Sequence, residues 1–110
     1  MFLDRVRATG DWGNEAVEVA FQYVNDKIPD VNEVILIGDA PGNQDYQVES
    51  NRKRLTEDYW NKEGFPSTTT DKELLRLKDN NILVHGFYFR KTAFKKNDVK
   101  EYFEKVSKNL

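Results

Sequence analysis

The sequence contains no cysteine and only one histidine among its 110 residues. The absence of cysteine excludes disulfides, thiolate metal sites and cysteine nucleophiles. A single histidine, His85, also excludes a zinc site built from several histidines. The chain also lacks a large excess of either charge. Its 17 basic and 19 acidic residues give a net charge of -2 and are interspersed along the sequence. This pattern gives no electrostatic argument for nucleic-acid binding.

Long hydrophobic runs are also missing from the chain. The longest apolar stretch is far shorter than the ~20 residues that a membrane helix needs. Residues 1–5 lack the apolar core of a signal peptide. We therefore expect no membrane association, and an intracellular location is the default expectation, although the compartment stays unknown.

The first part of the chain is typical of a helix followed by a strand. A helix is predicted over residues 15–25, buried around most of its circumference, because five apolar residues recur there at helical spacing. These residues are Ala16, Val17, Ala20, Phe21 and Val24. An apolar run without polar interruption then predicts a strand over residues 33–37, buried on both faces of a sheet.

The second part of the chain repeats this alternation. An amphipathic helix is predicted from Val48, Arg52, Leu55 and Tyr59, which fall on one face. A short helix follows from residue 70 to about residue 78, and a second apolar run predicts another central strand over residues 82–89.

Capping signals mark two of the helices in this part. Thr70 and Glu73 have the spacing of a capping box, in which the threonine caps the helix and the glutamate reaches back. The last helix is predicted from apolar residues at i, i+3, i+4 and i+7, with Asn97 or Asp98 as its cap. The four apolar residues are Val99, Tyr102, Phe103 and Val106.

The order helix, strand, helix, helix, strand, helix predicts a single α/β domain over residues 1–110. We expect a parallel sheet flanked by helices on both faces, which is a three-layer, Rossmann-like arrangement. Only two strands are evident, however, and strands that are apolar on both faces usually lie in sheets with ~5 or 6 members. The predicted sheet is therefore narrow and looks incomplete.

Asp39 is the residue with the clearest functional position. It follows the apolar run at the carboxyl end of the first predicted strand, where open α/β sheets build their sites. Gly38 before it and Pro41-Gly42 after it impose a sharp turn that holds the acid at the rim of the sheet. This position suits a metal ligand or an active-site acid. The alternative is an aspartate that caps the turn by accepting backbone hydrogen bonds.

Two segments in order resemble the middle of a von Willebrand factor type A domain. They are Ala-Thr-Gly-Asp-Trp-Gly-Asn-Glu-Ala-Val at residues 8–17 and Val-Ile-Leu-Ile-Gly-Asp-Ala-Pro-Gly-Asn at residues 34–43. In that family a glycine-rich, acidic loop and a helix precede the fourth strand, which ends in a metal-site aspartate. The similarity continues through residues 57–60, 82–88 and 102–106. It indicates the C-terminal half of such a domain, with the first three strands expected upstream.

The resemblance implies a non-enzymatic protein-interaction module with a metal-ion-dependent adhesion site for Mg²⁺. Asp39 matches the fourth-strand aspartate, Thr9 the threonine of the second loop, and Asp11 the acid of that loop. The family's remaining ligands come from an Asp-x-Ser-x-Ser loop, which this sequence lacks. Because Mg²⁺ prefers six oxygen ligands, we expect a degenerate site whose Mg²⁺ affinity in this chain alone is weak or absent.

The resemblance also implies a protein partner. Trp12 and Asn43, at the ends of the two loops, are candidate partner-binding residues, although Trp12 could equally cover the end of the sheet. In the family, the strand at residues 33–37 pairs with a strand that this chain does not contain. The unpaired apolar edge invites pairing with another copy, so we expect self-association, most simply as a two-fold dimer.

A small metal-dependent enzyme is the alternative to a binding module. In that hypothesis Asp39 takes part in phosphoryl transfer at the carboxyl end of the strand. Against it, no glycine-rich phosphate loop opens a helix directly after either predicted strand. His85, a lone histidine within an apolar run, is interpreted as a packing residue.

Overall fold

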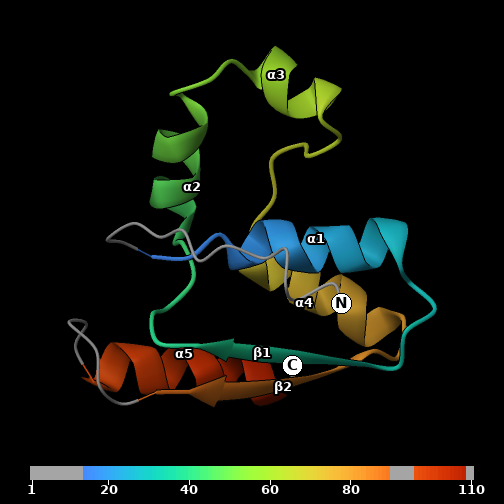
Figure 1. Cartoon of the computed structure of the whole chain (residues 1–110), viewed down its shortest axis with the longest axis vertical. Helices are drawn as coiled ribbons and strands as arrows, with labels where there is room; N and C mark the ends of the chain where they lie inside the picture. Colours follow the sequence, from blue (N-terminus) through green and yellow to red (C-terminus); the bar gives the residue numbers. More distant parts are fainter. Residues whose placement is uncertain (1–13, 90–95, 109–110) are drawn as a thin grey trace, which may run out of the picture.

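Helices and parallel strands alternate along the chain, as described by a computed structural model for residues 14–89 and 96–108 (Figure 1). Within these residues the protein is mixed α/β, with five helices and a sheet of two strands. The elements in order are α1 (Val17–Lys27), β1 (Glu33–Gly38), α2 (Asp45–Arg52), α3 (Glu57–Lys62), α4 (Thr70–Asp79), β2 (Leu83–Tyr88) and α5 (Lys96–Lys108). The predicted α/β class is confirmed.

The two strands pair in parallel along their whole length. Glu33 lies opposite Leu83 at one end of the ladder, and Gly38 lies opposite Tyr88 at the other. A parallel pair needs a long crossover connection, which α2, α3 and α4 provide. Asn81 adopts a φ of 58° in the turn from α4 into β2. Asparagine tolerates this left-handed conformation better than most residues do.

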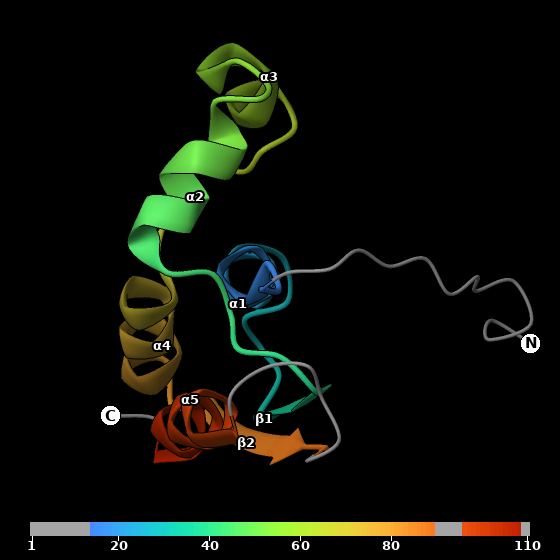
Figure 2. The same ribbon diagram turned by 90° about the vertical axis from the view of Figure 1, so that its left-hand side faces the viewer.

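Within the part of the chain that the structure describes, helices cover only one face of this sheet. In Figure 2 the helices α1, α4 and α5 lie along one side of the strands. On that side Val84 is buried, and Val34 and Leu36 pack against the core. On the other side Ile35 and Ile37 alternate with them and are each 62% exposed. The prediction that both strands are buried on both faces is therefore wrong for the described residues.

The hydrophobic core lies between the covered face of the sheet and the helices. It combines residues from α1, α4, β2 and α5 with the turn that precedes β2. Its buried members are Val17, Phe21, Leu74, Leu77, Ile82, Val84 and Val106. Residues 14–89 and 96–108 thus form a two-layer core, with one layer of helices against one sheet face.

α5 packs unusually close to β2 because Gly86 has no side chain. A Cβ at Gly86 would lie 3.0 Å from the carbonyl oxygen of Phe103 and 3.0 Å from Oγ of Ser107. At this short separation the backbone amide of Gly86 donates a hydrogen bond to Ser107 Oγ at 2.8 Å. Since α5 begins at Lys96, Asn97 and Asp98 lie inside its first turn. The prediction that one of them caps the helix is wrong.

α1 buries a different set of residues from the predicted one. Val17 and Phe21 are buried as predicted, but Ala16 and Ala20 are exposed. Polar residues one helical turn apart occupy the buried positions in their place. These residues are Glu18, Gln22 and Asn25, which are 4%, 3% and 6% exposed. The periodicity located the helix, whereas its buried face was set by contacts with other elements.

The helix predicted from Val48 to Tyr59 is in fact two helices, α2 and α3. α2 ends at Arg52, and Thr56 caps α3, because its hydroxyl accepts a hydrogen bond from the amide of Tyr59. Val48 and Arg52 are buried, while Leu55 in the connection is 45% exposed. The four residues predicted to share one helical face are therefore divided between α2, the connection and α3.

α4 also begins differently from the prediction. Its cap is Thr69, whose hydroxyl accepts a hydrogen bond from the amide of Lys72. The carboxylate of Glu73 does not reach back to the cap but is buried against Asn25 and Arg76. Among the residues that the structure describes, no helix has the length and apolar character needed to cross a membrane.

Candidate functional site

The two loops singled out by the sequence meet at the carboxyl end of β1. The amide of Glu15 donates to the carbonyl of Pro41 at 3.0 Å, and the amide of Asn43 donates to the carbonyl of Glu15 at 2.8 Å. These bonds form an isolated parallel bridge between Glu15 and Gly42. The side-chain amide of Asn14 adds a hydrogen bond to the carbonyl of Gly42 at 3.2 Å. The start of α1 is thus tied to the turn that follows Asp39.

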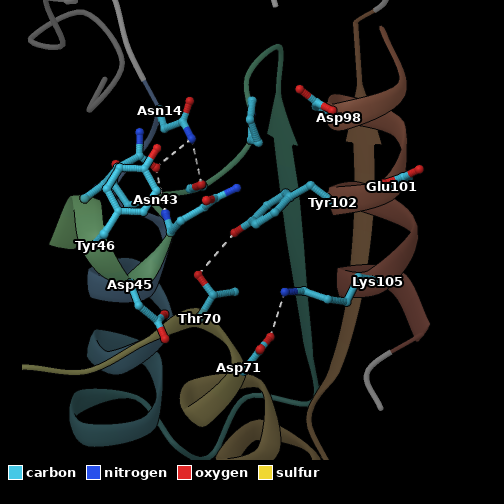
Figure 3. Close-up of a pocket in the computed structure, with 14 residues that line it drawn as sticks. Asn14, Asn43, Asp45, Tyr46, Thr70, Asp71, Asp98, Glu101, Tyr102 and Lys105 are labelled. Atoms are coloured by element: carbon cyan, nitrogen blue, oxygen red, sulfur yellow. Dashed lines mark hydrogen bonds and ion pairs between the residues drawn. The ribbon is translucent and has the colours of Figure 1, made fainter. Parts of the chain in front are cut away.

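A cleft of about 890 Å³ opens beside this bridge (Figure 3). Its walls are the turn at residues 41–44, the first turns of α2 and α4, and one side of α5. The charged residues that line it are Asp45, Asp71, Asp98, Glu101 and Lys105. Lys105 pairs with Asp71 at 2.7 Å, which leaves the cleft with an excess of negative charge. The cleft therefore disfavours phosphate, although two helix N-termini open into it.

Tyr102 lies at the centre of the cleft wall. Its hydroxyl shares a hydrogen bond of 3.4 Å with Oγ1 of Thr70. Burial raises the pKa of the Tyr102 phenol to about 12, so the group stays neutral at physiological pH. A Cβ on Gly42 would collide with the Tyr102 hydroxyl, which explains glycine at that position. Tyr102 can donate or accept a hydrogen bond here, but it cannot serve as a base.

Asp39 lies at the carboxyl end of β1, as the sequence indicates, and its side chain is exposed. Among the described residues its carboxylate has no hydrogen-bond or ion-pair partner, and it does not line the cleft. Thr9, Asp11 and Trp12 lie outside the described residues. Within residues 14–89 and 96–108, no three His, Cys, Asp or Glu side chains converge to hold a metal ion. The magnesium site stays a prediction.

Asn43 holds the turn against α1. It is 8% exposed, and its side-chain amide donates to Oε1 of Glu18 at 3.4 Å. Contact between Asn43 and a partner therefore stays a prediction as well. His85, interpreted from sequence as a packing residue, instead has a side chain that is 46% exposed and lies 3.9 Å from Glu33.

The second candidate site is the uncovered side of the sheet, here called the open face. Its apolar members are Ile35 and Ile37 (62% exposed each), Leu83 (54%), Phe87 (58%) and Phe89 (63%). Glu33 and His85 lie at its amino-terminal end and middle, and Asp39 follows its carboxyl end. In the sequence, this surface corresponds to apolar residues that occur at both odd and even positions of each strand, and therefore on both of its faces. This pattern was interpreted as burial because parallel strands usually lie inside a protein.

No protein-family model, no curated protein and no solved structure matches this chain. The similarity to a von Willebrand factor type A domain thus rests on the ordered sequence segments alone.

Proposed function

We propose that this chain is a non-enzymatic protein-interaction module whose partner covers the open face of the sheet. The observation that carries this proposal is a set of five adjacent apolar side chains that are 54–63% exposed. Taking ~200 Å² for a free side chain of this size, they present on the order of 600 Å² of apolar surface. A patch of this size is at the upper end of the ~300–600 Å² of the largest apolar patch on a typical monomer, and such patches are often functional.

The partner supplies the layer that the described sheet lacks. Parallel strands are normally covered by helices on both faces, since βαβ crossovers place helices there. α1, α4 and α5 provide one such layer. A layer from another polypeptide on the open face produces the three-layer, Rossmann-like arrangement expected from the sequence.

A single amphipathic helix from another protein fits the open face best. Neighbouring strands are ~4.8 Å apart, so a two-stranded face with its side chains is about as wide as one helix, ~10–12 Å. From Glu33 to Asp39 the strand spans roughly 20 Å at ~3.3 Å per residue. A helix of about 13 residues has the same length at ~1.5 Å per residue.

The charges at the two ends of the open face specify the partner further. Glu33 lies at one end and Asp39 at the other, and among the described residues the only basic group between them is His85, 3.9 Å from Glu33. Basic residues at both ends of the docked helix complement these acids. A second copy of the chain brings the same acids, so a basic amphipathic helix is the preferred occupant.

A synthetic peptide of 14 residues tests this proposal. It carries leucines at i, i+3, i+4 and i+7 spacing and lysines at both ends, and its control has the same composition with the leucine spacing scrambled. Ile37→Lys is expected to weaken peptide binding about tenfold or more, since burying an isoleucine contributes about 1.5–3 kcal/mol. Leu75→Lys is the matched control, because Leu75 is 53% exposed on α4, away from the open face.

Fluorescence anisotropy measures peptide binding, and sedimentation at micromolar concentration measures self-association in parallel. Equal binding of both peptides, or equal loss in both variants, contradicts the proposal. A dimer that is abolished by Ile37→Lys and is not displaced by the peptide identifies a second copy as the occupant. Self-association that survives Ile37→Lys points instead to the outer edge of β1, which pairs with no other described strand.

We further propose weak Mg²⁺ binding at Asp39 as part of the module. One exposed carboxylate leaves most of the six positions to water, so half-saturation is expected at roughly millimolar Mg²⁺. Titration with Mg²⁺, followed by NMR, should shift signals near Asp39 in the parent chain and in the control Asp45→Asn, but not in Asp39→Asn. Bound Mg²⁺ reverses the charge at that end of the open face, so the lysine peptide is titrated in the absence of Mg²⁺.

The enzyme hypothesis makes the opposite prediction. Turnover of a phosphate ester by the purified chain, abolished by Asp39→Asn, is incompatible with a non-enzymatic module. Identical Mg²⁺ responses in Asp39→Asn and Asp45→Asn exclude Asp39 as a ligand.

A further inference from the structure

A small polar cavity lies between α1 and the segment that contains α2 and α3. Its volume is about 80 Å³, which is room for several water-sized groups. The polar side chains that line it include Glu18 and Gln22 of α1, Arg52 of α2, Trp60 of α3, and Asn43 and Thr68. The cavity is separate from the open face, so the inference below is independent of the proposed function.

Two buried acceptor atoms, on residues that line this cavity, have no hydrogen-bond partner among the described residues. They are Oε2 of Glu18 and Oε1 of Gln22, on side chains that are 4% and 3% exposed. The residues are four apart on α1 and therefore project from the same helical face. Their other polar atoms are already used, since Glu18 Oε1 accepts from Asn43 and Gln22 Nε2 donates to the carbonyl of Pro66. Two acceptors together require a ligand that is rich in donors.

The surrounding charges require a cation. Nε and one terminal nitrogen of Arg52 donate to Glu57 at 3.0 Å each. Arg76, the next guanidinium along this side of α1, is bonded to Glu73 and Asp26. Both cations are thus engaged by other carboxylates. The charge of Arg52 acts on Glu18 only weakly, and among the described residues Glu18 forms no ion pair of its own. A buried carboxylate without an ion-pair partner is unfavourable.

We infer that this cavity binds a primary ammonium group, which donates hydrogen bonds to Glu18 Oε2 and Gln22 Oε1. An ammonium head is small enough for the space and offers three donors together with a positive charge. The ring of Trp60 also lines the cavity, but the guanidinium of Arg52 already lies over it, 5.0 Å from the ring centroid, so the carboxylate and amide oxygens have to hold the ammonium group. The group arrives either as a free ammonium ion or at the end of an alkyl chain, as in a lysine side chain of a partner.

A proton on Glu18 competes with the ammonium group, because it also neutralises the buried carboxylate. Burial raises the pKa of Glu18 above its ordinary value of 4.5, against smaller opposing effects from hydrogen bonds, including one from Asn43, and from the charge of Arg52. Because the folded chain holds the proton more tightly, stability falls as the pH rises from 4.5 through the raised pKa of Glu18. Above that window Glu18 is charged, and the cation has its largest effect.

Thermal unfolding at pH 8 tests the inference. The parent chain is compared in ammonium chloride, butylammonium chloride and tetramethylammonium chloride at equal concentration, since the last cation has no donors. Ammonium at tenfold its dissociation constant is expected to raise Tm by a few degrees, on the order of 5 °C, relative to tetramethylammonium. Glu18→Gln is expected to abolish this rise, whereas Glu33→Gln on the exposed end of β1 should retain it.

The butylammonium arm separates the two sources of the ligand. A rise in Tm with ammonium alone assigns the site to the free ion, and an equal rise with butylammonium assigns it to an alkylamine such as a lysine side chain. The same rise in tetramethylammonium, or in Glu18→Gln, overturns the inference. No rise in any salt, together with a Glu18→Gln variant at least as stable as the parent at pH 8, shows that a proton alone balances Glu18 and also overturns it.

Discussion

Phe103→Ala is expected to lower the free energy of unfolding by about 3–5 kcal/mol, whereas Phe87→Ala changes it by less than about 0.5 kcal/mol. Phe103 is 2% exposed, and its ring lies 5.6 Å from Tyr88 and 5.7 Å from Tyr102. Removing this ring leaves a cavity where α5 meets β2. Phe87 is 58% exposed on the open face, so its truncation removes little packing from the isolated chain.

Urea unfolding followed by circular dichroism measures both variants against the parent chain. The two variants form a matched pair, because the same substitution is made in α5 on the covered side of the sheet and in β2 on the open face. The loss at Phe103 is large compared with the ~5–15 kcal/mol that stabilises a typical domain. A comparable loss at Phe87 means that the open face is covered in solution. If that loss depends on protein concentration, a second copy covers the face. If it does not, another part of the same chain covers it.

The strands were predictable because their signal is local. An uninterrupted apolar run bounded by turn residues locates a strand, and the parallel pairing follows from the helices between the two runs. The number of covered faces is not a local property. Val34 and Leu36 differ little in chemistry from Ile35 and Ile37, yet the first two face helices and the last two face solvent. Which phase is covered depends on where α1, α4 and α5 pack.

The candidate site was predictable only in part for the same reason. The position of Asp39 follows from a strand that ends in Gly38, and the structure has the aspartate there. The bridge between Glu15 and Gly42 joins segments far apart in sequence, and no spacing rule predicts it. Glu18 was not singled out, because helical periodicity assigns charged residues to solvent. Its burial results from tertiary contacts with Asn43 and the α2 segment.

Glu73 shows how strongly such contacts can override a local motif. Its spacing from Thr70 is that of a capping box, but its carboxylate lies in the interior, where the residue is 1% exposed. It accepts hydrogen bonds from Thr68 Oγ1 at 2.7 Å, Asn25 Nδ2 at 2.8 Å and Arg76 at 2.8 Å. One side chain thus links α1, α4 and the segment that precedes α4.

Glu73→Ala is therefore expected to cost about 3–5 kcal/mol, since it leaves a buried polar cluster without its shared acceptor. Arg76 retains Asp26 at 2.6 Å, but Asn25 and Thr68 lose their side-chain partner. Glu73→Gln keeps one acceptor oxygen and removes the charge, so an intermediate loss is expected. Urea unfolding provides the measurement for each variant.

Glu104→Ala is the control, because the side chain of Glu104 is 51% exposed and its one interaction with other described residues is an ion pair of 3.7 Å with Lys100. Its loss is expected to stay within about 0.5 kcal/mol, as for other exposed helical pairs. If Glu73→Ala costs no more than this control, the buried cluster does not hold α1 against α4. The packing of these two helices would then rest on their apolar core residues, which include Phe21, Leu74 and Leu77.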